Sequence, residues 1–380
     1  MKQFTALCGI LAGLAGAAHA GGVDRSGQPI GIIFEKGNYA ELSYGQINPS
    51  VSGNDVAAFG GRPSGQVADS HSLPGIALKY DFNESLSGAI IYDNAYGADI
   101  AYPTALAGGS VALGGTSAKL DSEGVTAILR YKFSESFSAH AGIRASKASG
   151  EVTLSGLAYG PVNGYNVSFD EDWGTGYLVG VAYEKPEIAL RVALTYFSKV
   201  KHELDTTETF ATAVGPIPGG VPLASVTNVN TPQAVNLDVQ SGVAKDTLVF
   251  GSIRWVDWSS FLIDPARFTA VTGGGLVSLE DSVTYTLGVG RKFNDNWSGS
   301  VFATYEPSGD PLVSPLAPTN GYRGIGIAAV YTRDNMKITM GARYLDLGNA
   351  QPETGTPDTA RADFRDNHAT AVGIKVGFTF

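Results

Sequence analysis

Six basic residues of this sequence lie in the same kind of local sequence pattern. Each lies in a stretch where apolar and polar residues alternate, and each falls on the polar side of the alternation. A basic group in a narrow, partly desolvated site pairs more strongly with a carboxylate than it does in bulk water, so the set could hold an anionic head group. Alternatively, these side chains form salt bridges with acids such as Asp170, Asp172 and Asp238. The six residues are Arg130, Arg144, Arg191, Arg254, Lys292 and Arg343.

Two segments with the composition of loops carry many apolar side chains. They are residues 103–115 and 209–226. Exposed loops are normally polar, so we expect these apolar side chains to form a surface groove that binds a hydrophobic molecule. Inward packing of the two loops is an alternative that is compatible with the first. The predicted groove residues are Leu106, Val111, Leu113, Phe210, Val214, Ile217, Val221 and Leu223.

The sequence lacks the local motifs of catalysis. No G-x-S-x-G, H-E-x-x-H or phosphate-loop pattern occurs, and the histidines after the first twenty residues are widely separated. A serine and a histidine brought together across strands would need no local motif, so a hydrolase remains an alternative. The acidic run at 170–172 could bind a divalent ion, but we interpret it as a solvated strand end. We predict no catalytic residue, metal site or cofactor.

The elements that would position these residues are strands, as the end of the chain illustrates. The last twelve residues, "ATAVGIKVGFTF", place apolar side chains on one parity from Val372 to Phe380 and small or polar side chains on the other. Successive side chains of a strand point to opposite faces, so this strand has one apolar face and one polar face. Its glycines, β-branched residues and aromatics also favour a strand over a helix.

The composition indicates an exported, all-β membrane protein. Residues 1–20 combine Lys2, a short apolar run and the small-residue pattern Ala18-His19-Ala20, which is typical of a cleaved secretory signal peptide. Without Lys2, 25 basic residues remain against 36 acidic ones, a formal charge of −11 that argues against a nucleic-acid partner. Charged residues are only 16%, glycines number 49, and no later apolar run reaches the length of a membrane helix. These features favour an outer-membrane β-barrel.

Turn signals predict the number of strands. Six short polar turns lie at 83–85, 134–136, 185–187, 244–246, 294–296 and 334–335. Seven longer segments alternate with them, at 51–70, 102–118, 157–165, 207–226, 262–280, 310–320 and 349–366. Thirteen connections join 14 strands, and short turns on one side with long loops on the other are typical of bacterial outer-membrane barrels. We expect the last strand to pair with the first, so that no strand edge is left unpaired in lipid.

Aromatic residues gather near both predicted ends of the barrel. Those beside the short turns include Tyr80, Phe82, Phe137 and Phe293, and those toward the long loops include Trp173, Tyr196, Trp255, Trp258 and Tyr305. Outer-membrane barrels carry aromatic girdles at both membrane interfaces. We therefore expect two girdles of lipid-facing rings.

Several stretches of the chain resemble the FadL-type family of outer-membrane transporters. They are residues 94–103, 193–205, 231–261 and 279–307, among which Thr231-Pro232 and Trp258-Ser259-Ser260-Phe261 are the most specific. The resemblance implies a passive channel for long-chain fatty acids or other hydrophobic compounds. It also implies a lateral opening at a kink in the third strand, at Tyr96, Gly97, Ala98 and Asp99. A glycine there could interrupt the strand pairing and bend the strand inward.

The chain departs from that family in its N-terminal plug. The family's plug usually has some forty residues, whereas here only residues 21–36 precede the first strand. We therefore predict a signal peptide at 1–20, a short hatch-like segment at 21–36 and a barrel at 37–380, monomeric and surrounded by outer-membrane lipid and lipopolysaccharide. The alternatives are a porin-like channel for small polar solutes and, beyond that, a barrel enzyme or adhesin.

Overall fold

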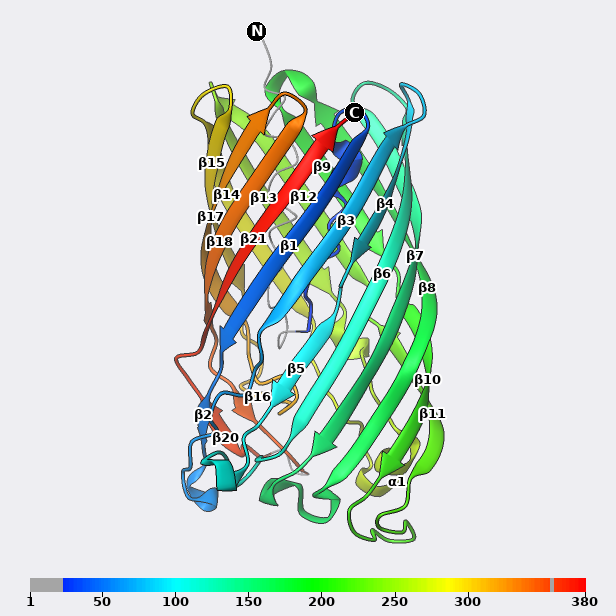
Figure 1. Ribbon diagram of the computed structural model, residues 1–380, viewed down its shortest axis with the longest axis vertical. Coiled ribbons are helices and arrows are strands. Elements are labelled where there is room, and N and C mark those ends of the chain that lie inside the picture. The colour runs from blue at the N-terminus through cyan, green and yellow to red at the C-terminus, as the bar shows by residue number, and fades with distance from the viewer. Residues whose placement is uncertain (1–22, 356–358) are drawn as a thin grey trace.

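The computed structural model describes residues 23–355 and 359–380. The predicted signal peptide, together with Gly21 and Gly22, lies outside the described residues. The described chain forms a closed antiparallel β-barrel of 14 spans (Figure 1), which confirms the predicted fold class. No helix among the described residues has the length and apolar character needed to cross a membrane.

Most spans are single strands. They are β1 (Tyr39–Ser50), β3 (His71–Asp81), β6 (Ser117–Lys132), β7 (Phe137–Leu154), β8 (Tyr165–Lys185), β13 (Thr247–Val256), β14 (Ser282–Lys292), β15 (Trp297–Glu306), β17 (Tyr322–Arg333), β18 (Met336–Leu347) and β21 (His368–Thr379). Three further spans are each interrupted and consist of two strands. They are β4 (Leu86–Asp93) with β5 (Gly97–Ala101), β9 (Leu190–Phe197) with β10 (Val200–Thr209), and β11 (Leu223–Thr231) with β12 (Ala234–Ala244).

The first and last spans close the barrel. β1 pairs with β21 in an unbroken antiparallel register from Tyr39 opposite Thr379 to Ser50 opposite His368. The two-residue alternation explains why this closed sheet is stable in a bilayer, because apolar side chains face outward while the opposite parity turns into the lumen. On β6, for example, Leu129 is 55% exposed and its neighbour Ile128 only 2%. The predicted alternation and closure are confirmed.

The six short turns lie at one end of the barrel, together with the C-terminus (Figure 1). Two of them place an aspartate at positive φ, Asp246 at 58° and Asp334 at 52°. Aspartate tolerates this left-handed conformation better than most residues, and two-residue hairpin turns require it.

The long connections form the opposite end. They carry small paired strands, β2 (Gly53–Asp55) with β20 (Ala362–Phe364) and β16 (Leu312–Val313) with β19 (Gln351–Pro352). They also carry one α-helix, α1 (Ala266–Thr272), inside the segment predicted as an irregular loop at 262–280. The 3₁₀ turns are η3 (Gly31–Phe34), η4 (Ala57–Phe59), η5 (Ala105–Ala107), η6 (Leu157–Val162), η7 (Pro186–Ile188) and η8 (Trp258–Ser260).

The three span interruptions lie near one another inside the barrel. The break between β4 and β5 contains Tyr96, whose hydroxyl donates to the carbonyl oxygen of Pro232 in the break between β11 and β12, at 3.4 Å. Pro232 has no N–H and cannot continue the hydrogen-bonded ladder. Thr231 Oγ1 in turn accepts a bond of 3.2 Å from the N–H of Val200, the first residue of β10. The three interruptions therefore lie at about the same height in the barrel wall.

Two predicted side-chain directions were wrong. Trp258, placed in the outer girdle, is 0% exposed and packs inside the barrel mouth, because β13 ends at Val256 and the chain turns inward through η8. Asp170, predicted to face the lumen, is exposed. The register between β7 and β8 shifts between Ala148 and Gly150, and the extra residue on β8 moves Asp170 to the other face.

Candidate functional site

The N-terminal segment lies in the lumen and binds the break in the third span. The backbone N–H of Gly97 donates to Val23 O at 2.9 Å, and the N–H of Arg25 donates to Ala95 O at 2.8 Å. The buried carboxylate of Asp24 pairs with Arg254 Nε of β13 at 2.7 Å. The segment is therefore fixed at one end to the β4–β5 break and at the opposite wall to β13.

Further along, the same segment fills the lumen near the short turns. The ring of Phe34 lies 4.6 Å from the guanidinium carbons of both Arg130 and Arg191, and it meets the ring of His140 edge to face. Ile32 and Ile33 of η3 are buried. Aromatic rings stabilise cations held over their faces, so Phe34 connects two walls of the barrel through charged side chains.

The six predicted lumen cations are mostly paired within the protein. Arg130 pairs with Glu184, Arg144 with Asp93 at 2.8 Å and Arg254 with Asp24. Arg191 donates to Gln240 at 3.1 Å, and Lys292 pairs with Asp295 of its own turn at 2.9 Å. Arg343 donates to Thr304 at 3.0 Å, while its Nη1 is buried without a hydrogen-bond partner. The paired acids are other residues than the Asp170, Asp172 and Asp238 of the sequence-based alternative.

A polar cavity of about 760 Å³ lies beside the N-terminal segment. Arg191, Asp238, Arg254 and Arg343 line it together with Phe34. This cavity and the ion pairs around it make the half of the lumen nearest the short turns polar. Binding of an anionic head group to these cations stays a prediction.

The predicted kink residues lie at and just after the break between β4 and β5. Tyr96 is buried within the break, and its ring meets Trp258 edge to face at 5.5 Å. Gly97 begins β5, and a Cβ there would lie 2.3 Å from the Arg25 guanidinium, so the close approach of the N-terminal segment requires glycine. Ala98 lines an apolar cavity, and Asp99 O accepts from the N–H of Asp69 at 3.0 Å.

The break leaves part of the neighbouring span without a strand partner. β3 pairs with β4 from Ile76 to Asp81, but β5 pairs in a ladder only with β6. Pro74 of β3 faces the unpaired stretch and brings no N–H of its own. The wall is thus interrupted between the second and third spans.

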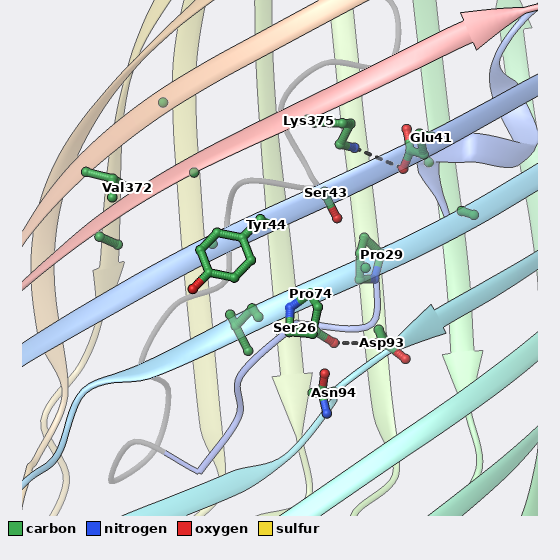
Figure 2. A pocket seen from close by; sticks show the side chains of 18 of the residues that line it. Ser26, Pro29, Glu41, Ser43, Tyr44, Pro74, Asp93, Asn94, Val372 and Lys375 are labelled. Atoms are coloured by element: carbon green, nitrogen blue, oxygen red, sulfur yellow. Dashed lines mark hydrogen bonds and ion pairs between the residues drawn. The ribbon is translucent and has the colours of Figure 1, made fainter.

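A cavity of about 1100 Å³ occupies this interruption. It is lined by Ser26 and Pro29 of the lumenal segment and also by Tyr44 and Val372, whose side chains are exposed on the outer face of the barrel. Figure 2 shows Ser26 bonded to Asp93 at the end of β4, with Asn94 and Pro74 beside them. Residues that face the lumen and residues that face outward therefore both border this cavity.

A second cavity, of about 820 Å³, lies toward the long loops and is almost wholly apolar. Its apolar side chains come from spans on several sides of the barrel and from the loop that begins with η8. They include Leu120, Val152, Phe169, Leu204, Val229 and Phe261. Val23 and Tyr96 also line it, so the N-terminal residue of the described chain and the break in the third span both border this apolar cavity.

The eight residues predicted to form the loop groove differ in how exposed they are. Leu113, Phe210 and Ile217 are buried, and Val111, Val214 and Leu223 are half-buried. Leu106 and Val221 are exposed. None of these eight described residues lines either of the two large cavities, so the inward packing of the loops accounts for most of them.

Sequence reasoning missed Trp258, Phe261 and His202 as lumenal residues. The segment 258–261 was recognised as characteristic, but its direction depends on a turn after β13 that no alternation reveals. His202 falls on the inward parity of β10, where every second residue from Val200 is buried, so the alternation could have identified it.

Comparison with known proteins identifies the family. Residues 31–310 match the model of the outer membrane protein transport family OMPP1/FadL/TodX. A search of curated proteins finds no match to this sequence. The family match covers most of the chain.

Solved structures show the same fold. A Pseudomonas aeruginosa FadL homologue superposes with a TM-score of 0.75 at 15% identity, over 97% of this chain and 98% of that one. The Pseudomonas putida toluene transporter TodX gives 0.65 at 13% identity, over 93% and 92%. The monoaromatic hydrocarbon channel CymD gives 0.57 at 15% identity, over 90% and 88%. The chain belongs to the FadL/TodX family of outer-membrane transport proteins of Gram-negative bacteria.

Proposed function

We propose that this protein is a passive channel through which hydrophobic molecules, long-chain fatty acids or aromatic hydrocarbons among them, cross the polar outer leaflet and leave sideways into the membrane. The observation that carries the proposal is the cavity at the β3–β4 interruption, which lumenal and lipid-facing residues line together. The family transports hydrophobic compounds, and the named relatives include a toluene transporter and a monoaromatic hydrocarbon channel.

The proposed path has three successive parts. Leu106 and Val221 are the two predicted groove residues that are exposed, and they form the landing surface. The molecule then enters the apolar cavity, whose lining is almost wholly apolar. Val23 and Tyr96 lie between this apolar cavity and the cavity at the interruption. Their displacement lets the molecule reach the lateral opening.

The polar half of the lumen explains why the exit is lateral. A hydrophobic molecule that continued toward the short turns would have to displace Phe34 from Arg130 and Arg191 and enter a cavity lined by charges. Exposing apolar surface to such a site gains nothing, whereas the lipid at the lateral opening is apolar. The lateral opening is therefore the favourable way out.

The ion pairs favour this function over a porin for small polar solutes. A porin needs a continuous water-filled lumen. Here the N-terminal segment occupies the lumen through contacts with β13, β6 and β9. A wide aqueous passage is absent from this level of the described chain.

Two measurements on the full-length protein, one in cells and one on the purified protein, test the proposal. Uptake of a hydrophobic tracer is measured in a strain that lacks its own channel of this kind, with and without this protein. Conductance is measured in planar bilayers. We expect faster uptake and low conductance; large, steady conductance without uptake would reject the proposal in favour of a porin.

A further inference from the structure

The apolar cavity contains one buried ring nitrogen that the protein leaves without a hydrogen bond. His202 of β10 is 0% exposed and lines the cavity. Its Nε2 has no hydrogen-bond partner among the described residues. A buried polar atom without a partner is costly, so such an atom at a cavity wall indicates a function.

The surroundings of the other ring nitrogen, Nδ1, determine whether Nε2 carries a proton. His202 Nδ1 lies 3.3 Å from the carbonyl oxygen of Asp172 and 3.6 Å from its carboxylate Oδ2. Both neighbours are acceptors, so Nδ1 carries the proton and donates it. In the neutral ring Nε2 then has a free lone pair and acts as a hydrogen-bond acceptor.

Asp172 is held in place for this role. Its Oδ2 accepts the backbone N–H of Glu203 at 3.0 Å, where β8 and β10 are not paired in a ladder. The register shift that turned Asp170 outward lies beside it. The irregular wall thus positions an acceptor against Nδ1 and orients the imidazole ring.

Two hydroxyls at the cavity are already engaged in hydrogen bonds within the protein. Ser122 Oγ accepts from Tyr96 N at 2.9 Å and donates to Tyr96 O at 2.8 Å. Thr231 Oγ1 accepts from Val200 N. Phe169, Leu204 and Val229 lie around the same space and offer no polar atom on their side chains. Nε2 of His202 differs from these hydroxyl oxygens in having no hydrogen-bond partner among the described residues.

We propose that His202 Nε2 accepts a hydrogen bond from a hydroxyl group of the ligand, so that the apolar cavity prefers phenols and alcohols over molecules of the same shape without an O–H. The inference rests on the proposed function, because it takes the apolar cavity as a ligand site. It adds a chemical class of ligand and a specificity-determining residue.

A pair of matched ligands tests the preference in the wild-type protein itself. The probes are 4-hexylphenol and 4-hexylanisole, which differ in the methyl group that replaces the hydroxyl proton. Binding to the full chain in detergent is measured by equilibrium dialysis against protein-free micelles, which corrects for partitioning. One hydrogen bond in an apolar site corresponds to a preference of roughly three- to tenfold for the phenol.

Variants assign the preference to one residue. His202→Phe and His202→Leu remove Nε2, and the second serves if the first does not fold; either should bind both ligands equally. The matched control is His140→Phe, because His140 is also buried in the lumen but does not line this cavity. We expect the control to keep the preference for the phenol.

The outcomes separate this inference from the proposed function. If the wild type binds both ligands with equal affinity, or if the His202 variants keep the preference, the role of His202 is rejected and the channel proposal stands. If neither ligand binds the wild type, the apolar cavity is no ligand site, and the proposed function fails together with the inference.

Discussion

The two halves of the lumen differ in whether their buried polar groups have bonding partners. From the level of the break to the short turns, Arg130, Arg144 and Arg254 each have a carboxylate partner, and Phe34 lies against two guanidinium groups. Toward the long loops, apolar side chains surround an open cavity, and Nε2 of His202 has no hydrogen-bond partner among the described residues. One half therefore holds its buried charges in ion pairs, while the other holds an open apolar cavity.

The lateral interruption lies where the two halves meet. Val23 and Tyr96 border the apolar cavity, while Asp93 at the end of β4 and Asn94 in the break line the cavity at the interruption. The N-terminal segment contributes to both sides, through Val23 and Ser26.

The largest expected effect comes from breaking the ion pair that anchors the N-terminal segment. Asp24→Ala leaves the buried Arg254 without its carboxylate, and loss of one partner of a buried pair costs about 3–5 kcal/mol. We expect the segment to detach and the polar half to conduct ions. Planar-bilayer recordings should show conductance well above that of the wild type.

The control for this prediction is Asp295→Ala, which removes a carboxylate from the exposed turn pair with Lys292. Its conductance should equal that of the wild type. If Asp24→Ala also stays at the wild-type level, then the pair with Arg254 does not hold the polar half closed.

A smaller effect is expected from filling the apolar half. Val229 lines the apolar cavity, and Val229→Trp would occupy its volume. The indole would take the space of the ligand, so hydrophobic ligands should bind more weakly, while overpacking costs about 1–3 kcal/mol of folding stability. Binding of 4-hexylanisole measures the loss, and unchanged conductance shows that the polar half is intact. Wild-type affinity in this variant would mean that ligands bind elsewhere.

The smallest effect is expected at the boundary between the halves. Tyr96→Phe removes the hydroxyl that reaches Pro232 O at 3.4 Å but keeps the ring against Trp258. Loss of such a bond is worth about 0.5–1.5 kcal/mol. We expect tracer transfer to become slightly faster, because Tyr96 moves aside more easily. Slower transfer would indicate that the hydroxyl guides the ligand instead of closing the path.

The sequence predicted the barrel because the bilayer imposes a local rule. Each span must have an apolar outer face, so the alternation from Val125 to Phe133 or at the C-terminal strand indicates both the strand and its direction. The turn at Asp334 was identified for the same local reason, a short polar sequence between two such strands. These features need no knowledge of distant residues.

The geometry of the candidate site could not be predicted, because it depends on contacts between distant residues and on local irregularities that the two-residue alternation does not reveal. Asp24 and Arg254 are 230 residues apart in sequence, and their pairing follows only from how the N-terminal segment lies in the closed barrel. A single extra residue in β8 reversed the direction of Asp170 and placed Asp172 against His202. Trp258 follows the end of a strand, where the two-residue period no longer determines direction.

Blocking the lateral opening tests the central claim most directly. Asn94 lines the cavity between β3 and the β4–β5 break, and Asn94→Trp would fill it from within the wall. Ile325→Trp, on the outer face of β17, is the matched control for an added indole ring. Tracer transfer into the membrane of proteoliposomes should fall to the protein-free level in Asn94→Trp and stay at the wild-type level in the control. Wild-type transfer in a correctly folded Asn94→Trp variant would contradict lateral exit.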